Sequence, residues 1–349
     1  MKDITFAVIG SGFMGSLLAR VCSELPYTRC VAASDLEFVR ADQLTTAFGG
    51  KPYGDYEEQA ILEMLENHHP EFVIIATPEA DHLAPVRAAA RAGCNIFLEK
   101  PIATSLEDAD AINKICTEAQ IKLMIGYILR FEVSYALIQS AIAEGSIGRF
   151  LSAYARRLAG INEARRLRAR VSPVSYIAVH DIDQFLWYHP VPVKSVYAKA
   201  LHGRVWEELG TYDSAWMMIE FEDGALAIHE VGWCLPEEWA KWQTPTSWGG
   251  FGDVRMNVIG THGNLNLDFT PMDLFGVNRE GWKLPDTRHW PVMHGKIVGA
   301  AKLEMEHFIE CVLHNKQPLV TGIDGRKSLE VMLAAEQSIA EDRIVRLPL

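Results

Sequence analysis

The chain has 349 residues and a formal net charge of −12, with 33 lysines and arginines against 45 aspartates and glutamates. Hydrophobic residues make up 49% of the chain and charged residues 22%, which is typical of a globular protein and not of a disordered or fibrous one. The acidic balance excludes a general binder of the nucleic-acid backbone, which needs a basic surface. The length allows two domains with a sizeable core.

The six cysteines are scattered and form no CxxC pair, so we expect neither a disulfide framework nor a zinc cluster. The first residues, MKDITFAVIG, lack the basic region, the long apolar run and the cleavage site of a signal peptide. No apolar run approaches the length needed to cross a bilayer. These features predict a cytoplasmic protein that binds no nucleic acid, membrane or metal.

Residues 3–130 predict a doubly wound parallel sheet, because short apolar runs alternate with amphipathic segments. Continuous apolar runs fit strands that are buried on both faces. We assign residues 1–125 to this Rossmann dinucleotide-binding domain. The expected strands are ITFAVIG, CVAASD, FVIIATP, NIFLEKP and KLMIGY, and the expected helices are 14–25, 56–67, 81–92 and 106–119.

The remaining residues, 126–349, predict an α/β domain with a large open sheet that is mainly antiparallel. Asp223-Gly224 is a strong hairpin signal between two strand-like runs, and direct hairpin links imply antiparallel pairing. One face of such a sheet packs on helices, and the other is available to a partner subunit. The expected strands are 193–204, 212–222, 225–234, 254–260 and 264–269, and the expected helices are 131–144, 172–189, 300–315 and 326–341.

A glycine-rich loop, Gly10-Ser11-Gly12-Phe13-Met14-Gly15, lies between the first strand and the first helix. In this context Gly10 permits a tight turn, Gly12 allows the backbone to approach a pyrophosphate, and Gly15 allows the helix to pack on the strand. The N-terminus of the helix supplies amide donors to the anion. The loop therefore predicts a nicotinamide dinucleotide site, and the alternative is a glycine-rich turn with a capping aspartate.

Asp35 ends the second apolar run, twenty residues after Gly15. A carboxylate at this place accepts hydrogen bonds from the ribose hydroxyls and repels a 2′-phosphate. Asp35 therefore favours NAD over NADP, although Arg40 is a candidate for binding a 2′-phosphate.

Two further strand ends lie at the same edge of the expected sheet, where ligands bind in open α/β folds. They carry Thr77-Pro78 and Glu99-Lys100. His82 begins the next helix, where a cofactor contact and a capping or packing role are equally good interpretations.

Lys100 is the strongest candidate for a reactive group, since it follows an apolar strand where a solvated lysine is out of place. Burial and a neighbouring cationic nicotinamide disfavour an ammonium, which suits a general base. The alternative is a salt bridge to Glu99 or to another carboxylate.

The motifs GSGFMG, TPEADH, EKP and GYILRF occur in this order and are followed by HDIDQFLW. With a closing pattern that runs from Glu304 and Phe308 to Leu347-Pro348, they resemble the family of glucose–fructose oxidoreductases and inositol dehydrogenases. The resemblance covers most of the chain. It implies a Rossmann domain followed by an open-sheet domain, oxidation of a sugar or cyclitol hydroxyl or the reverse reduction, and a homodimer or homotetramer.

The resemblance also implies roles for two residues. Lys100 orients the reacting hydroxyl and assists its deprotonation, and His180 exchanges a proton with the same oxygen. Asp183 lies one turn after His180 on the same helix face, and we place it in the substrate site. Without the resemblance, a buried histidine bonded to Asp183 is the commoner arrangement. Asp181 is expected to point elsewhere, toward solvent or a subunit contact.

Tyr176 departs from the family pattern, in which many members carry an aspartate four residues before this histidine. A phenol has a reference pKa of about 10 and donates a hydrogen bond, whereas a carboxylate only accepts. Tyr176 therefore either joins Lys100 and His180 in proton transfer or contacts the substrate. In both cases inositol specificity does not transfer directly.

Arginines and tryptophans supply further candidates for substrate binding. We expect Arg130, after the last Rossmann strand, to line the cleft between the domains. An arginine-rich segment follows, which is either an anion site for an acidic or phosphorylated sugar, with Arg157 in contact with substrate, or a solvated loop or subunit contact. Its members are Arg156, Arg157, Arg165, Arg166, Arg168 and Arg170. The tryptophans Trp233, Trp239, Trp242 and Trp248 stack on a sugar ring or pack in a core or interface.

The sequence thus predicts an NAD(P)-dependent oxidoreductase acting on a sugar, a sugar derivative or a cyclitol. Two alternatives remain open. One is a sugar–sugar oxidoreductase that never releases its cofactor, and the other is a non-catalytic NAD-binding sensor.

Overall fold

The computed structural model describes residues 3–55, 57–167, 170–237, 243–244, 252–269, 274, 276–279 and 281–349. The chain divides into two compact units. The first comprises Met1–Phe131 and His289–Leu329, and the second comprises Glu132–Arg288 and Glu330–Leu349. No helix in the described ranges is both long and apolar enough to span a membrane.

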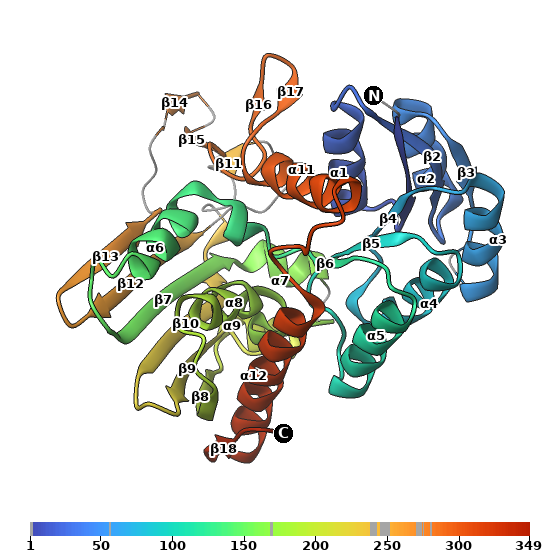
Figure 1. The fold of residues 1–349 in the computed structure, drawn as a ribbon. Coiled ribbons are helices and arrows are strands. Elements are labelled where there is room, and N and C mark those ends of the chain that lie inside the picture. Colours follow the sequence, from blue (N-terminus) through green and yellow to red (C-terminus); the bar gives the residue numbers. More distant parts are fainter. Residues whose placement is uncertain are drawn as a thin grey trace. The chain divides into compact units, whose positions relative to one another are not determined.

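The first unit is built on a six-stranded parallel sheet of order β3-β2-β1-β4-β5-β6 (Figure 1). The strand order reverses between β1 and β4, which is where open α/β sheets bind ligands. This confirms the predicted Rossmann fold. Its strands are β1 Ile4–Ile9, β2 Thr28–Ser34, β3 Lys51–Tyr53, β4 Phe72–Ile75, β5 Asn95–Leu98 and β6 Leu123–Ile125, and its connecting helices are α1 Phe13–Ser23, α2 Phe38–Phe48, α3 Glu58–His68, η1 Glu79–Asp81, α4 Leu83–Arg91 and α5 Leu106–Glu118.

The pattern of apolar runs did not reveal α2 and β3. Helix α2 buries only three residues and has no side-chain N-cap, so its amphipathic pattern is weak. Strand β3 has three residues, one of them Pro52, and lies at the edge of the sheet, where proline is tolerated.

The segment His289–Leu329 belongs to the first unit, and its assignment to the second domain was wrong. Its helix α11 (Ala300–Leu313) contacts α1 and the short helix η2 (Ile128–Phe131). The ring of Phe308 on α11 packs edge-on against Phe72 of β4 and Phe97 of β5, with centroids 5.5 and 5.7 Å apart. A helix from late in the chain thus completes the Rossmann core, and an amphipathic pattern alone does not indicate which sheet a helix covers.

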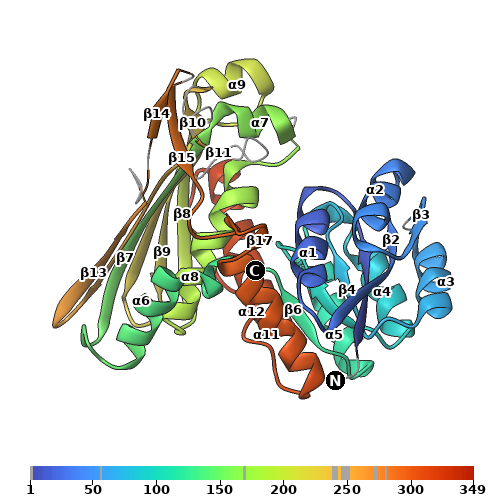
Figure 2. The same ribbon diagram turned by 90° about the horizontal axis from the view of Figure 1, so that it is seen from above.

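The second unit is built on a seven-stranded sheet of order β13-β12-β7-β10-β9-β8-β18 (Figure 2). Its neighbouring strands are antiparallel except for the parallel pair β7 and β10. The predicted open and mainly antiparallel sheet is therefore confirmed. The strands are β7 Phe150–Gly160, β8 Val193–Leu201, β9 Ser214–Phe221, β10 Leu226–Leu235, β12 Asp253–Gly260, β13 Gly263–Asp268 and β18 Val345–Arg346.

Strand β7 lies inside this sheet. Its second half carries the first two arginines of the arginine-rich segment, which we interpreted as an anion site, a solvated loop or a subunit contact. Its buried positions alternate, with Ala153, Ala155 and Arg157 facing inward. Small alanines and a buried arginine do not resemble the apolar pattern of a strand, so this element was missed. The chain continues directly into the short helix α7 (Ile161–Leu167).

One face of the large sheet is covered by helices, as Figure 2 shows for α6 (Val133–Ala143) and α8 (Val179–Tyr188). Ser338 on α12 (Gly322–Glu341) accepts a hydrogen bond from the backbone of Ala198 in β8, at 2.9 Å. No described helix covers the opposite face. The remaining elements are the short helix α9 Arg204–Leu209, a small sheet of β11 Gln243–Thr244, β14 Gly276–Asn278 and β15 Gly281–Pro285, and a hairpin of β16 Val292–Met293 and β17 Lys296–Ile297.

Candidate functional site

The glycine loop in the first unit has the geometry of a dinucleotide-binding turn. Gly10 has a φ of +89°, and a Cβ there would lie 2.6 Å from the carbonyl of Ala76. A Cβ on Gly15 would lie 1.9 Å from the carbonyl oxygen of Gly10, so the helix can approach the loop only with glycine there. A Cβ on Gly12 would meet nothing within 4 Å. Gly12 therefore borders open space, which fits the close approach of a pyrophosphate to its backbone.

Asp35 is brought to this loop as predicted. Its Oδ2 accepts a hydrogen bond from the backbone N–H of Ser11 at 2.8 Å, and its Oδ1 accepts one from Glu37 at 2.9 Å. Arg40 binds Glu37 at 2.9 Å and lies 4.0 Å from Asp35. A 2′-phosphate at this place would meet two carboxylates, so the geometry supports NAD over NADP. Phe13 and Met14 open α1 beside the loop, and the Phe13 ring contacts Trp290 edge-on at 6.1 Å.

His82 connects two of the strand-end loops. Its Nε2 is 3.2 Å from the carbonyl oxygen of Thr77, which precedes Pro78, and its Nδ1 is 3.2 Å from that of Ile102. The ring is 1% exposed, and burial lowers the pKa of His82. Both ring nitrogens of His82 lie close to backbone carbonyl oxygens. The structure therefore favours the packing role of His82 over a cofactor contact.

Lys100 and Glu99 directly follow β5, at the same edge of the sheet as the glycine loop. Lys100 is half-buried, and the peptide bond between Lys100 and Pro101 is cis. The carboxyl group of Glu99 is 8% exposed and accepts a hydrogen bond from the backbone N–H of Lys100 at 3.2 Å. Burial raises the pKa of Glu99 to about 7, although the positive charge of Lys100 opposes this effect. The edge therefore holds an acid that titrates near neutral pH beside the candidate base.

Arg130 is tied to its own unit. Its guanidinium is 3% exposed, donates to the carbonyl oxygen of Leu319 at 3.2 Å and lies 3.4 Å from Asp324. These contacts hold η2 against the first turn of α12 and the segment that precedes it. They account for the burial of Arg130 without a substrate.

In the second unit, His180 lies in the first turn of α8 and is half-buried. The predicted helix 172–189 is not regular, since a π-helical turn, Val174–Ala178, precedes α8. Tyr176 lies in this turn, and its hydroxyl accepts a hydrogen bond from Arg166 at 3.0 Å. Turns of this kind occur frequently at functional sites.

Asp181 is buried, so the expectation that it contacts solvent or a partner subunit was wrong. Its Oδ2 accepts a hydrogen bond from Arg157 Nε at 2.6 Å and lies 3.0 Å from Nε2 of His229. Arg157 Nη2 bonds the other carboxylate oxygen at 2.9 Å and the hydroxyl of Tyr135 at 2.8 Å. Burial opposes the charge, but the guanidinium of Arg157 and then His229 lower the pKa of Asp181 well below its usual range.

This buried network joins α8 to the sheet, because Arg157 belongs to β7 and His229 to β10. It engages Arg157 within the protein, which counts against the predicted contact between Arg157 and substrate. Sequence reasoning missed His229 altogether. The sequence did contain a signal for His229, because a histidine stands at an inward-facing position of the strand-like run that forms β10. Asp183 is also buried, at 0% exposure, and accepts a hydrogen bond from Gln184 at 3.3 Å.

Three other arginines of the arginine-rich segment are paired with carboxylates. Arg156 binds Glu230 at 3.1 Å and Asp253 at 2.9 Å. Arg165 binds Glu208 and Glu237, and Arg166 binds Glu163. These pairs neutralise the cluster and disfavour an anion site. Arg168 lies outside the described residues.

Trp233 is fully buried, and its Nε1 donates a hydrogen bond to the carbonyl oxygen of Tyr212 at 3.2 Å. It therefore packs in the core instead of stacking on a sugar. Trp239, Trp242 and Trp248 lie outside the described residues.

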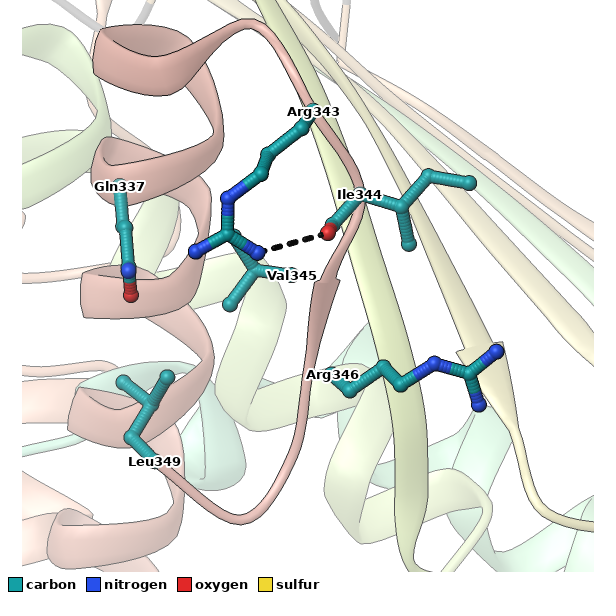
Figure 3. Close-up of a pocket in the computed structure, with 6 residues that line it drawn as sticks. All are labelled: Gln337, Arg343, Ile344, Val345, Arg346 and Leu349. Carbon is teal, nitrogen blue, oxygen red and sulfur yellow. Dashed lines mark hydrogen bonds between the residues drawn. The ribbon is translucent and has the colours of Figure 1, made fainter.

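A pocket of about 520 Å³ lies where α12 and β18 meet, as Figure 3 shows. Arg343 donates a hydrogen bond to the carbonyl oxygen of Ile344 across it, at 3.2 Å. None of its lining residues is a predicted site residue, so it is not the candidate site. In the ranges that the structure describes, no cluster of three or more histidine, cysteine or acidic side chains could hold a metal ion. The pocket is lined by Gln337, Arg343, Ile344, Val345, Arg346 and Leu349.

Two family models match the chain. Residues 4–127 match the oxidoreductase family with an NAD-binding Rossmann fold, and residues 135–266 match the GFO/IDH/MocA C-terminal domain. The chain belongs to the GFO/IDH/MocA oxidoreductase family. This confirms the predicted family, and the first unit is its NAD-binding domain.

Similar proteins cover almost the whole chain. The scyllo-inositol 2-dehydrogenase (NAD(+)) of Bacillus subtilis is 27% identical over 99% of this chain and 96% of its own length. A 2,7-anhydro-N-acetylneuraminate hydratase of Mediterraneibacter gnavus is also 27% identical, over 99% and 97%. The crystal structure of scyllo-inositol dehydrogenase from Lactobacillus casei, with bound NAD(H) and scyllo-inositol, superposes with a TM-score of 0.82 at 21% identity and covers 99% of each chain. That structure shares the fold.

Proposed function

We propose that this protein is an NAD-dependent dehydrogenase that acts on a hydroxyl-bearing carbon of a cyclitol, a sugar or a sugar derivative. One observation carries the proposal: Lys100 lies at the sheet edge that also holds the glycine loop and Asp35. The names of curated relatives support the substrate class, since several are inositol dehydrogenases and one is a D-apiose dehydrogenase.

The residues of the first unit fit NAD. The open space at Gly12 suits the pyrophosphate, and the carboxylate of Asp35 suits the ribose hydroxyls. When bound, NAD supplies the acceptor for a hydride from the substrate carbon. Thr77, Pro78 and Glu99 at the neighbouring strand ends complete the predicted cofactor edge.

In the proposed reaction Lys100 binds and orients the substrate hydroxyl and withdraws its proton. His180 exchanges a proton with the same oxygen. Tyr176, held by Arg166 in the π-helical turn, contacts the substrate or extends this proton path. Asp183 stays in the proposed substrate site, one turn after His180 on α8, with a side chain that is buried in this structure.

We further propose that the open face of the large sheet binds a second copy of the chain. Exposed apolar side chains follow one another across its strands. Ile228 of β10 is paired with Tyr154 of β7 and Met218 of β9, and Trp216 of β9 is paired with Lys199 of β8. Trp216 and Met218 are each 42% exposed and Ile228 is 37% exposed. A contiguous apolar patch of this kind marks an interaction surface. A homodimer or homotetramer fits it.

All six cysteines are free thiols, five of them buried. Free buried thiols fit a reducing compartment, which supports the predicted cytoplasmic location.

The test is the reduction of NAD, followed by absorbance, over a panel of inositols, aldoses, uronates and sugar phosphates. We expect NADH to form with neutral cyclitols or sugars, and NADP to react more weakly. Activity with uronates or sugar phosphates alone would favour the arginine-rich segment as an anion site. Binding of NAD without turnover of any compound would contradict the proposal and favour the sensor.

The hydratase among the relatives supports a second candidate, in which the substrate changes while the nicotinamide shows no net change. Chromatography of the substrate mixture, run beside the absorbance assay, separates the two candidates. Product without NADH indicates the hydratase class or a sugar–sugar oxidoreductase. Loss of cofactor on gel filtration then excludes the latter.

A further inference from the structure

A carboxyl group on α12 reaches the start of the segment that carries Tyr176. Glu336 lies in the part of α12 that belongs to the second unit, and it is half-buried. Its Oε1 accepts two hydrogen bonds, one from the hydroxyl of Ser172 and one from the hydroxyl of Tyr212 at 3.0 Å. Ser172 lies two residues before the π-helical turn that holds Tyr176. Side-chain hydrogen bonds therefore join α12 to the start of this turn.

Ser172 closes the first turn of the segment through its side chain and its backbone. Its Oγ accepts a hydrogen bond from the N–H of Ser175 at 3.0 Å, and its own N–H donates to Oγ of Ser175 at 2.9 Å. This reciprocal pair is the pattern by which a serine caps the N-terminus of a helix. The carbonyl oxygen of Ser172 accepts a hydrogen bond from the N–H of Tyr176 at 3.1 Å. The position of Tyr176 thus depends on the conformation of Ser172.

Glu336 fixes the direction of the Ser172 hydroxyl. A serine hydroxyl rotates freely unless its proton has an acceptor, and its lone pairs turn with it. Because the proton of Ser172 points to Glu336, the lone pairs of the same oxygen stay available to the N–H of Ser175. Burial raises the pKa of Glu336, and the hydrogen bonds from Ser172 and Tyr212 oppose this effect.

Both Glu336 and Tyr212 are tied to the large sheet of the second unit. Tyr212 is 8% exposed, and its carbonyl oxygen accepts a hydrogen bond from Nε1 of the buried Trp233 in β10 at 3.2 Å. Two residues after Glu336, Ser338 accepts a hydrogen bond from the N–H of Ala198 in β8 at 2.9 Å. The carboxyl group of Glu336 is therefore a fixed point against which the π-helical turn is held.

We propose that Glu336 is a positioning residue for Tyr176 and His180: by accepting the hydroxyl of Ser172, its carboxyl oxygen holds the start of the π-helical turn that leads into α8. The effect on catalysis rests on the proposed function, in which His180 exchanges a proton with the substrate. The link between Glu336 and the turn does not rest on it.

The test is hydrogen–deuterium exchange of the full-length protein without cofactor or substrate, read by mass spectrometry of peptides that cover the turn. The N–H groups of Ser175 and Tyr176 report its first turn, since both are bonded to Ser172. Glu336→Gln keeps an acceptor oxygen for the hydroxyl of Ser172, whereas Glu336→Leu removes it.

Glu341→Leu is the matched control on the same helix. Glu341 ends α12, is exposed and binds Arg343. Its loss removes a carboxylate from α12 without touching Ser172.

We expect the N–H groups of Ser175 and Tyr176 to exchange about 3- to 10-fold faster in Glu336→Leu, because a weakened helix cap opens more often. In Glu336→Gln and Glu341→Leu the rates should stay within about twofold of wild type. Equal rates in Glu336→Leu and wild type would overturn the proposal. Equally fast exchange in the glutamine and leucine variants of Glu336 would overturn it too.

A purely structural role of Glu336 would loosen α12 as a whole. The N–H of Ala198 would then exchange faster as well, because its acceptor is Ser338 on α12. The proposal requires the change at the turn without a change at Ala198, and an equal change at both places contradicts it. Should Glu336→Leu not fold, Glu336→Met takes its place with the same expected rates, since methionine is unbranched and adapts to irregular space.

The effect on catalysis is measured separately, with NAD and the best compound of the substrate panel. We expect kcat to fall by about 10-fold in Glu336→Leu, because the groups that meet the substrate are misplaced, and to stay within about threefold of wild type in Glu336→Gln. NAD affinity should not change, since the cofactor residues belong to the first unit. Faster exchange with unchanged kcat would overturn the positioning role. If wild type turns over no compound, the proposed function fails, and the exchange experiment still decides whether Glu336 holds the turn.

Discussion

At the scale of single residues, Asp35 connects the structure of the glycine loop with the proposed cofactor site. Its Oδ2 accepts a hydrogen bond from the backbone N–H of Ser11 and so shapes the glycine loop. In the proposed function the same carboxylate also accepts hydrogen bonds from the ribose hydroxyls. The carboxylate therefore links the conformation of the loop to the choice of cofactor.

We expect Asp35→Ser to weaken NAD binding by about 10- to 100-fold, the loss of one or two hydrogen bonds to a charged group. Binding of NADP should weaken less or improve, because the repulsion of a 2′-phosphate disappears. Isothermal titration with both cofactors measures this. Glu37→Gln is the matched control for NAD affinity alone, since Glu37 is exposed and binds Arg40. Unchanged NAD affinity in Asp35→Ser would remove Asp35 from the cofactor site.

Residues of the candidate site could be predicted where a sequence motif is tied to one local backbone geometry. The glycine loop, Asp35 and the place of Lys100 after β5 follow from spacing and strand ends. The burial of Asp181 could not be predicted, because its partners Arg157 and His229 come from strands whose pairing is set by the whole sheet.

At the scale of elements, the buried network of Arg157, Asp181 and His229 attaches α8 to the sheet. Asp181→Ala should destabilise the protein by about 3–5 kcal/mol, because a guanidinium would be left buried without its counter-charge. Asp223→Ala should cost much less, since Asp223 binds His189 near the surface of the same unit. Urea unfolding of both variants makes the comparison. Equal losses would show that the network does not hold α8.

Helices and strands were predicted well where the apolar residues follow a clear period. They were predicted poorly where the residues at inward positions are not typical of the element. The strands β1, β2, β4, β5 and β6 were found as apolar runs. Strand β7 was missed because alanines and Arg157 fill its inward positions. The π-helical turn that holds Tyr176 was taken as regular helix, because a single such turn before an α-helix changes the apolar pattern of the segment little.

At the scale of the whole molecule, α11 returns from late in the chain to the Rossmann core. Sequence order therefore misassigned His289–Leu329, since contacts between distant segments leave no local pattern. The open face of the large sheet in the second unit is the surface that we propose for assembly of the chain with a second copy.

We expect Trp216→Glu or Ile228→Glu to lower the mass of the particle in analytical ultracentrifugation, because a charge in an apolar contact between copies is strongly unfavourable. Leu137→Glu is the control, since Leu137 is 63% exposed on α6, which covers the other face of the sheet. If Leu137→Glu loses the oligomer while Trp216→Glu and Ile228→Glu keep it, the interface lies elsewhere than on the open face of the sheet.

The central claim is that Lys100 handles the proton of a substrate hydroxyl while NAD accepts a hydride. The most direct test is the rate of NADH formation by Lys100→Met and by wild type, each saturated with NAD and with the best compound of the panel. The account predicts that turnover falls by at least about 100-fold while NAD affinity, measured by titration, stays within a few-fold of wild type. Turnover close to that of wild type in Lys100→Met would contradict it.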